Sequence, residues 1–501
     1  MLCFLHRMAK LIFFLFTLRF PFILLPLHPI MLTILIVLAY FALLFAVSRW
    51  AGRRATNETF FRANRRSPWY MVAFGMVGAS ISGITFVSVP GMVMRTQMTY
   101  LQTCMGFILG YVVVAFVLLP LYYRLNVISI YALLGKRLGE TAHKTGSAFF
   151  LLSKMTGAAV RFYVVCIILQ RFIFDPLGVP FVATAIGMVA LIWLYTRRGG
   201  IRTLVFTDVV QTVCLFTALL FIIYKVVADL GLSPREAVAA VTQSELSRVF
   251  VLDDWLSTQN FWKQFVSGAF IVIVMTGLDQ DMMQKNLTCR SLRDAQKDMC
   301  TYGVAFLPAN LLFLALGVLL TLWYQQQVID LPAAPDDLLP QYISLSSLRS
   351  PLSSLFVLGI VAASFSSADS ALTSLTTIYC VDIKERPADE SLRKRTHLLM
   401  CVLFVLFILL FRVVNSTSLI DAIYILVGYT YGPLLGLFAF ALLVKRPLHD
   451  RLVPYVAVAS PVLCYAIDSA AVRLADYHFG YELLMLNGLL TFLGLCFIRR
   501  S

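Results

Sequence analysis

The sequence predicts an all-α polytopic membrane protein. Of its 501 residues, 60% are hydrophobic and only 13% are charged, which is too little charge to cover the surface of a soluble protein of this size. Apolar windows of the length that crosses a bilayer divide the chain into about thirteen spans. These lie near 31–50, 68–92, 98–123, 147–171, 176–196, 203–227, 262–284, 300–324, 352–379, 397–414, 419–444, 453–473 and 481–498.

The positive charge follows the connections between these spans. A net charge of +15 could indicate nucleic acid in a soluble protein, but here the basic residues lie in every second short loop, where they set topology, and no nucleic-acid partner is expected. The positive-inside rule places those loops in the cytoplasm, Met31 outside and Ser501 inside, in a plasma (inner) membrane. The ten cysteines include no CxxC pair and indicate no disulfide or metal site.

Residues 1–30 differ from the rest of the chain. They are apolar, but Arg7, Lys10, Arg19 and several prolines interrupt them, and no small-residue cleavage site marks a signal peptide. We interpret 1–30 as an N-terminal extension before the core, consistent with a start codon assigned too far upstream.

One stretch, MVAFGMVGASISGITFVSVPG at 71–91, cannot be an ordinary spanning helix. Its glycines and Pro90 weaken the helix, and its serines and Thr85 bring hydroxyl groups to mid-span. It predicts a broken helix whose freed carbonyls face a cavity. A tightly packed helix is the alternative, because small residues also let membrane helices approach closely.

Two further spans carry polar groups at similar depth. VAASFSSADSALTSLTTIYCVDI at 361–383 crowds hydroxyls around Asp369, and such oxygen ligands suit a hard cation. The seventh span is interrupted in VMTGLDQDMMQ by Gly277 and Asp279. Because the second and seventh spans cross in opposite directions, their breaks indicate a transporter with its site at the midplane.

Several motifs together resemble the solute:sodium symporter family, whose members carry proline, sugars, sialic acid, pantothenate or iodide. Besides the two serine-rich stretches, they are GGIRTLVFTDVVQ (199–211), GLDQDMMQKNLTCRSLRDAQ (277–296) and YGPLLGLF (431–438). The resemblance implies a leucine-transporter-type core of two inverted repeats of five spans each. The expected organisation is a peripheral span (31–50), the two repeats (68–227 and 262–444) and two C-terminal spans (453–498).

The same resemblance implies a sodium site. Two carbonyls of the broken second span and three oxygens of the ninth would bind the ion, at the positions of Gly78, Ile81, Ala363, Ser366 and Ser367. Asp208 matches an aspartate that contributes to a second sodium site in some members, although a solvated interfacial aspartate is the alternative. For the two serines, the alternative is a hydroxyl bonded to its own helix backbone.

The candidate substrate residues surround the same region. They are Ser82, Thr85, Arg161, Tyr163, Asp279 and Gln280. A guanidinium group in mid-membrane is costly and needs an acidic partner, a carbonyl or an anionic ligand. Arg161 is therefore expected to pair with Asp279 in the empty carrier and to bind a substrate carboxylate. A purely structural ion pair is the alternative.

The leading function is sodium-coupled symport, in which sodium drives the import of a small polar, anionic or zwitterionic organic solute by alternating access. A sodium-coupled carrier of a sugar or another neutral solute is the alternative. A channel, a membrane enzyme and a transporter-like sensor fit the sequence less well, because the chain shows asymmetric halves and no reactive His or Cys cluster. The oligomeric state stays open.

Overall fold

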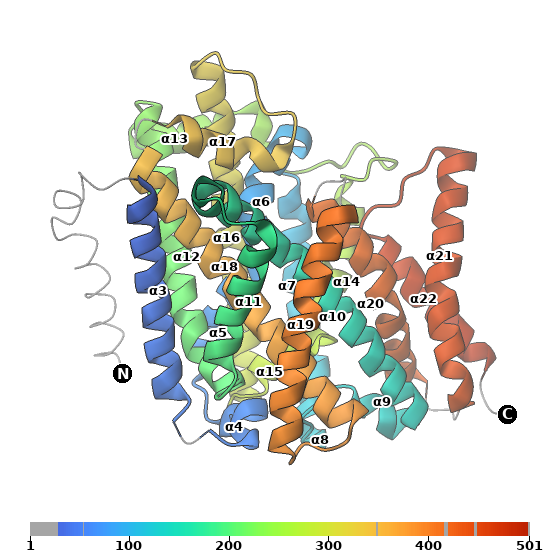
Figure 1. Cartoon of the computed structure of the whole chain (residues 1–501). Coiled ribbons are helices and arrows are strands. Elements are labelled where there is room, and N and C mark those ends of the chain that lie inside the picture. Colours follow the sequence, from blue (N-terminus) through green and yellow to red (C-terminus); the bar gives the residue numbers. More distant parts are fainter. Residues whose placement is uncertain (1–28, 54, 347–348, 415–418, 445–447, 499–501) are drawn as a thin grey trace.

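The computed structural model describes residues 29–53, 55–346, 349–414, 419–444 and 448–498, so the expected N-terminal extension lies almost wholly outside them. Within these ranges the chain is helical, and a single isolated bridge pairs Ser67 with Cys289. The helices are α3 (Pro29–Ala51), α4 (Asn57–Arg62), α5 (Trp69–Ser80), α6 (Gly83–Thr96), α7 (Tyr100–Val113), α8 (Leu119–Leu125), α9 (Ala132–Arg137), α10 (Glu140–Leu169), α11 (Phe181–Thr196), α12 (Ile201–Asp229), α13 (Pro234–Gln243), α14 (Phe261–Val272), α15 (Gln280–Asn286), α16 (Leu292–Gln326), α17 (Leu338–Leu345), α18 (Arg349–Ile378), α19 (Glu390–Val414), α20 (Leu419–Leu443), α21 (Val453–Ala475) and α22 (Leu483–Phe497) (Figure 1).

Every predicted span coincides with a helix or with a pair of consecutive helices. Eight helices of the described chain are long and apolar enough to cross a membrane, and two bent pairs raise the number to ten. Three shorter apolar helices, Phe181–Thr196, Gly428–Leu443 and Leu483–Phe497, match the remaining predicted spans. How many of these helices cross the bilayer stays a prediction.

Short helices cap the two ends of the bundle. α13 and α17 lie at one end, and α4, α8 and α9 lie at the other (Figure 1). α13 begins where the sequence SPRE supplies Ser233 as N-cap, Pro234 in the first turn and Glu236 to complete a capping box. α13 and α17 lie in the two longest loops between predicted spans, 228–259 and 325–350.

The polar ninth span lies at the centre of the molecule. The apolar window of the helix that contains it, Pro351–Ile383, is completely buried, whereas the windows of Met31–Ala51 and Asp450–Ala475 are 33% and 17% buried. A serine-rich helix can be buried only if its hydroxyls find partners within the protein. The centre of the bundle is therefore polar, and the first and the penultimate predicted spans form its apolar periphery.

Candidate functional site

The second predicted span is broken, and the break lies at Ile81 and Ser82. α5 and α6 meet there at a bend of 60°, and both residues have extended backbone, with φ near −82°. Pro90 lies inside α6 and does not end it. Because α5 stops at Ser80, the carbonyls of its last turn have no intrahelical donor and are available to other partners.

Glycines allow α5 to pack closely against α12. A Cβ atom at Gly78 would lie 1.9 Å from Oγ1 of Thr212, and one at Gly75 would lie 2.9 Å from Cβ of Asp208. The tightly packed helix of the sequence analysis and the broken helix are therefore both present. The packing also places Asp208, which is 1% exposed, next to the broken segment, so the solvated alternative for this residue is wrong.

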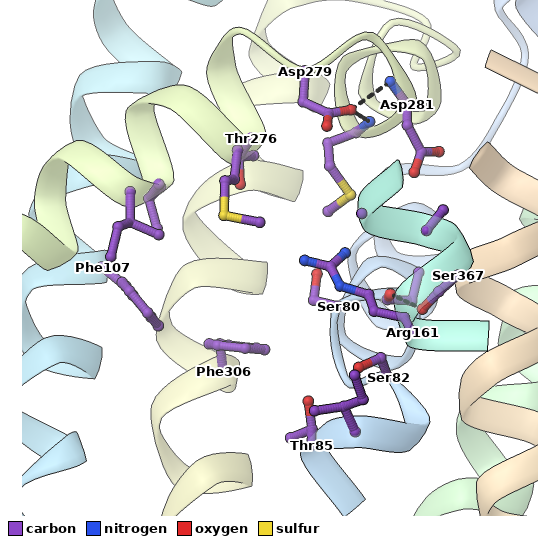
Figure 2. Close-up of a pocket in the computed structure, with 18 of the residues that line it drawn as sticks. Ser80, Ser82, Thr85, Phe107, Arg161, Thr276, Asp279, Asp281, Phe306 and Ser367 are labelled. Carbon is purple, nitrogen blue, oxygen red and sulfur yellow. Dashed lines mark hydrogen bonds between the residues drawn. The ribbon is translucent and has the colours of Figure 1, made fainter. Parts of the chain in front are cut away.

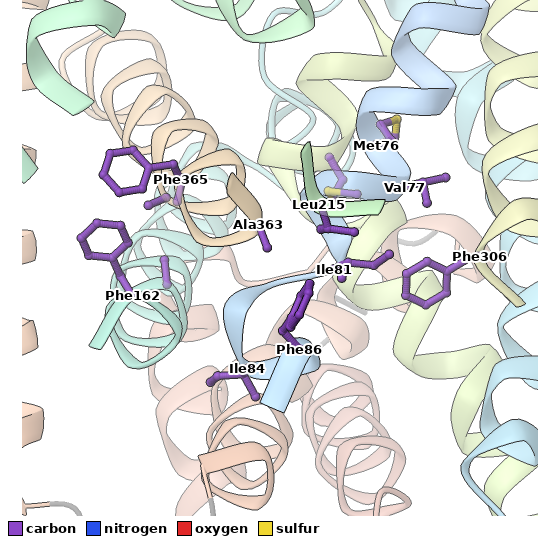
Figure 3. Close-up of a cluster of buried hydrophobic side chains, with 14 of the residues drawn as sticks. Met76, Val77, Ile81, Ile84, Phe86, Phe162, Leu215, Phe306, Ala363 and Phe365 are labelled. Atoms are coloured by element: carbon purple, nitrogen blue, oxygen red, sulfur yellow. The ribbon is translucent and has the colours of Figure 1, made fainter. Parts of the chain in front are cut away.

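The C-terminal end of α5, with its free backbone carbonyls, meets one face of α18. This face carries Ala363, Ser366 and Ser367 and is called the serine face below. Ser367 donates a hydrogen bond to the carbonyl of Ala79 at 2.8 Å and a longer one, 3.3 Å, to that of Ala363. In Figure 3, Ala363 projects from α18 toward the break that carries Ile81. The structure thus brings the predicted ligands of the two spans together.

The second predicted serine ligand contacts an acid. Ser366 donates to Oδ1 of Asp208 at 2.7 Å, while Oδ2 of Asp208 pairs with Nζ of Lys285 at 2.8 Å. A hydroxyl that gives away its hydrogen keeps its lone pairs on the oxygen. Ser366 and Ser367 therefore both present oxygens that can accept a cation, even though Ser367 also makes the backbone bond at i−4 that the alternative predicted.

The seventh predicted span is bent by 69° between the segments Phe261–Gly277 and Gln280–Asn286. A π-helical turn, Ile273–Gly277, precedes the bend. Asp279 is the N-cap of α15 and accepts from the backbone N–H groups of Asp281 at 2.8 Å and Met282 at 3.4 Å. An aspartate is suited to this position because it satisfies orphan donors and complements the helix dipole.

A cavity opens between the two bends. It offers about 140 Å³ to the centres of water molecules. Aromatic residues, among them Phe107 and Phe306, form one wall, and Ser82 and Thr85 lie at one end (Figure 2). Asp279 and Asp281 lie at the other end, with Arg161 between these two groups (Figure 2). Four of the six predicted substrate residues therefore line one cavity: Ser82, Thr85, Arg161 and Asp279.

The pairing of the charges differs from the prediction. Lys154, not Arg161, binds the acids: its Nζ lies 3.1 Å from Oδ2 of Asp279 and 2.7 Å from Oδ2 of Asp281. Tyr431 adds a hydrogen bond of 2.8 Å to Asp279. The expected Arg161–Asp279 pair is wrong, because the two acids lie beside Lys154, about two helical turns before Arg161 on α10.

Two predicted substrate residues do not face the cavity. Tyr163 is buried between the rings of Phe181 and Phe411, at centroid distances of 5.9 and 5.4 Å. Gln280 accepts from the backbone N–H of Ile130 and donates to the carbonyl of Ile128, both at 2.9 Å. Both side chains hold packing partners in place, so the prediction that they line the cavity is wrong.

Sequence reasoning missed four polar residues of this region: Lys154, Lys285, Asn310 and Tyr431. Lys154, Asn310 and Tyr431 line the cavity, and Lys285 is 1% exposed. Lys154 lies in the motif KMTGAAVRFY that also supplied Arg161. Its depth within an apolar span was the available signal, since an intramembrane lysine marks a functional candidate as much as an arginine does.

Comparisons with known proteins agree with this geometry. The chain is 27% identical to the sodium/sialic acid symporter NanT of Aliivibrio fischeri, over 85% of this chain and 86% of the relative. It is 25% identical to the sodium/sialic acid symporter SiaT of Proteus mirabilis, over 81% and 83%. The solved substrate-bound, outward-open structure of a Na⁺-coupled sialic acid symporter superposes with a TM-score of 0.79, at 20% identity, over 93% of this chain and 97% of that one.

The family assignment rests on a match to a family model. Residues 60–449 fit the profile of the sodium:solute symporter family, more than half of the chain. The matched region includes both bends, the serine face of α18 and the cavity. The chain therefore belongs to the sodium:solute symporter family and is a sodium-coupled transporter of the membrane, not an enzyme.

Proposed function

We propose that this symporter imports a small organic acid that also carries hydrogen-bond donors, of the class to which acidic sugars such as sialic acid belong. Arg161 carries the proposal. In the described chain, no acidic side chain forms an ion pair with its guanidinium group; Asp279 and Asp281 both pair with Lys154 instead. An unpaired guanidinium facing a cavity is suited to a carboxylate, which it can bind through two parallel hydrogen bonds.

Two buried acceptor atoms at the cavity are evidence that the solute carries hydrogen-bond donors. Within the described chain, Oδ1 of Asp281 and Oδ1 of Asn310 have no hydrogen-bond partner, and both residues line the cavity. Buried acceptors normally have partners, so unsatisfied ones at a cavity favour a ligand with hydroxyl or amine donors. A neutral sugar would satisfy these acceptors but would leave Arg161 without a counter-charge.

We infer that sodium binds where the end of α5 meets α18. The carbonyls of Gly78, Ile81 and Ala363 and the hydroxyls of Ser366 and Ser367 are the proposed ligands, with Asp208 as a candidate for a second ion. The hydrogen bonds from Ser367 to Ala79 and from Ser366 to Asp208 support the assignment. They hold both hydroxyl oxygens in place with their lone pairs available.

We further infer two inverted repeats, 68–227 and 262–444, flanked by 31–50 and 453–498, in a plasma membrane with the basic loops in the cytoplasm. Single cysteines at two exposed positions, Arg66 near α4 and Asp337 near α17, test this orientation. The first cysteine should react only from the inside and the second only from the outside; reaction of both from one face contradicts the orientation.

Binding of sialic acid to the purified protein in sodium tests the substrate class. We expect Arg161→Ala to abolish binding and Arg161→Lys to restore it only weakly, because lysine lacks the planar fork. Arg412→Ala is the matched control: this arginine stacks over Phe181, 4.3 Å from the ring centroid, away from the cavity. If Arg161→Ala binds a neutral sugar as well as the wild type does, and sialic acid binds to neither, the anionic substrate class is wrong.

A further inference from the structure

A basic groove lies between the C-terminal ends of α3 and α11, at the end of the bundle where α4 lies (Figure 1). It offers about 510 Å³ to the centres of water molecules. Two arginines from each helix end line it: Arg49, Arg53, Arg197 and Arg198. The groove is separate from the solute cavity, since the two have no lining residue in common.

The two helix ends that form the groove are in close contact. Ser48 of α3 donates a hydrogen bond to the backbone carbonyl of Tyr195 in α11. The turns that follow these helices touch, because a Cβ atom at Gly199 would lie 3.3 Å from the Cα atom of Gly52. Such a backbone contact favours residues without a side chain. The four guanidinium groups therefore belong to one site built by the packing of α3 against α11.

The positive charge of the groove has no counterpart within the described chain. No residue that lines the groove is acidic, and none of its four arginines forms an ion pair there. Other basic residues do pair with acids, as Lys144 does with Glu140 and Lys394 with Glu390. The positive-inside rule accounts for arginines in this connection, but not for their convergence on one groove. Their unused N–H donors suit an anion with several acceptor oxygens.

The surface beside the groove is apolar. Leu38 on α3 and Ile186 on α11 are exposed, and the exposed Leu194 lines the groove itself. Trp50, next to the groove on α3, is also exposed, and tryptophan is enriched at the headgroup level of membranes. A molecule with an anionic head and apolar chains would contact both the arginines and this surface, whereas a soluble anion would contact the arginines alone.

We propose that the groove binds the phosphate headgroup of an anionic phospholipid such as phosphatidylglycerol. Guanidinium groups bind phosphate oxygens through paired hydrogen bonds, and basic pockets between membrane helices suit lipid headgroups. The acyl chains lie along the exposed apolar faces of α3 and α11. Tyr195 extends from the groove to Asp369 on α18, to which its hydroxyl donates at 2.6 Å. The bound lipid therefore stabilises the packing of the peripheral helices on the centre of the bundle, whatever solute is carried.

Melting of the purified protein in detergent, with increasing amounts of phosphatidylglycerol or phosphatidylcholine, tests the proposal. Phosphatidylglycerol should raise the melting temperature of the wild type, and phosphatidylcholine, which carries no net charge, should not. Arg49→Gln combined with Arg198→Gln should raise the phosphatidylglycerol concentration at half-maximal stabilisation by at least about tenfold, because each arginine near an anionic headgroup contributes to its binding. Both side chains are exposed, so their replacement should leave the fold intact.

Arg290→Gln combined with Arg293→Gln is the matched control. It removes the same charge from two exposed arginines at the start of α16, outside the groove, and it should respond to phosphatidylglycerol as the wild type does. An equal loss of response in both double variants would show a general attraction of basic loops and overturn the site. Equal stabilisation of the wild type by phosphatidylcholine would overturn the anionic headgroup.

Inorganic phosphate separates a lipid from a soluble anion. Phosphate alone should not replace phosphatidylglycerol; if it stabilises the wild type equally and the Arg49→Gln, Arg198→Gln variant no longer responds, the groove binds a soluble anion and the lipid assignment is wrong. Native mass spectrometry of the single variant Arg198→Gln gives a second measurement if the double variant does not fold. The wild type should retain phosphatidylglycerol that Arg198→Gln loses, and equal retention by both contradicts the proposal.

Discussion

The two bends of this symporter are built from different chemistry. The bend between α5 and α6 is uncharged: glycines pack it against α12, and backbone carbonyls and hydroxyls face one another across it. The bend before α15 is charged: Asp279 caps the helix and pairs with Lys154. Neutral oxygens suit sodium, whereas charged groups suit the polar ends of an organic solute. In the proposed account, sodium binds at the uncharged bend, while the solute cavity lies between both bends, with Ser82 and Thr85 at one end and Asp279 and Asp281 at the other.

The charged bend should be the more sensitive of the two. Asp279→Ala removes the cap of α15 and one acid partner of the buried Lys154, and we expect a loss of about 3 to 5 kcal/mol, as when a buried ion pair is broken. Asp279→Asn keeps a capping oxygen and should lose clearly less. Melting curves of the two variants measure the difference. Equal losses would show that the cap contributes nothing.

The uncharged bend depends on close packing. Gly78→Ala places a Cβ atom 1.9 Å from Oγ1 of Thr212, so we expect a loss of up to about 3 kcal/mol from overpacking. Gly187→Ala in α11 is the control, because nothing lies within 4 Å of a Cβ atom there. This control should be neutral or slightly stabilising, since alanine favours a helix over glycine. Rescue of Gly78→Ala by Thr212→Ala would confirm the contact, and a neutral Gly78→Ala would contradict it.

Removing one hydroxyl group at the charged bend should lower the stability of the protein by a smaller amount. Tyr431→Phe keeps the ring but removes the hydrogen bond of 2.8 Å to Asp279. A hydrogen bond to a charged group contributes about 1.5 kcal/mol or more, and the melting temperature should fall accordingly. Tyr163→Phe, at a buried ring outside the cavity, is the control. If both variants melt alike, Tyr431 does not stabilise the cap.

The sequence predicted the elements better than it predicted their contacts. Local composition located both bends, because glycines, hydroxyls and acids that gather within one apolar span are typical of the broken helices of transporters. It did not locate the first break at Ile81, and it gave Pro90 too much weight, since α6 continues through this proline. A stricter reading of helix start signals would have identified Asp279 as an N-cap.

The pairing of charges could not be predicted, because it depends on which helices meet. Arg161 and Lys154 lie on the same α10, and only the packing of α10 against α15 decides which of them reaches Asp279. In the same way, Gln280 binds the backbone at Ile128 and Ile130, far away in the sequence. Its position at the break of the seventh span placed Gln280 among the predicted substrate residues, whereas in the structure it supports a loop.

The sodium preference of the purified protein tests the central claim most directly, that the uncharged bend and α18 bind sodium. At about 100 times its dissociation constant, sodium should stabilise the wild type by about 2.7 kcal/mol, and potassium much less. Ser366→Ala combined with Ser367→Ala should abolish the difference between the two ions. Ser374→Ala should retain it, because the hydroxyl of Ser374 bonds only within α18, to Ala371 at 2.9 Å. An undiminished sodium shift in the double variant would contradict the assignment.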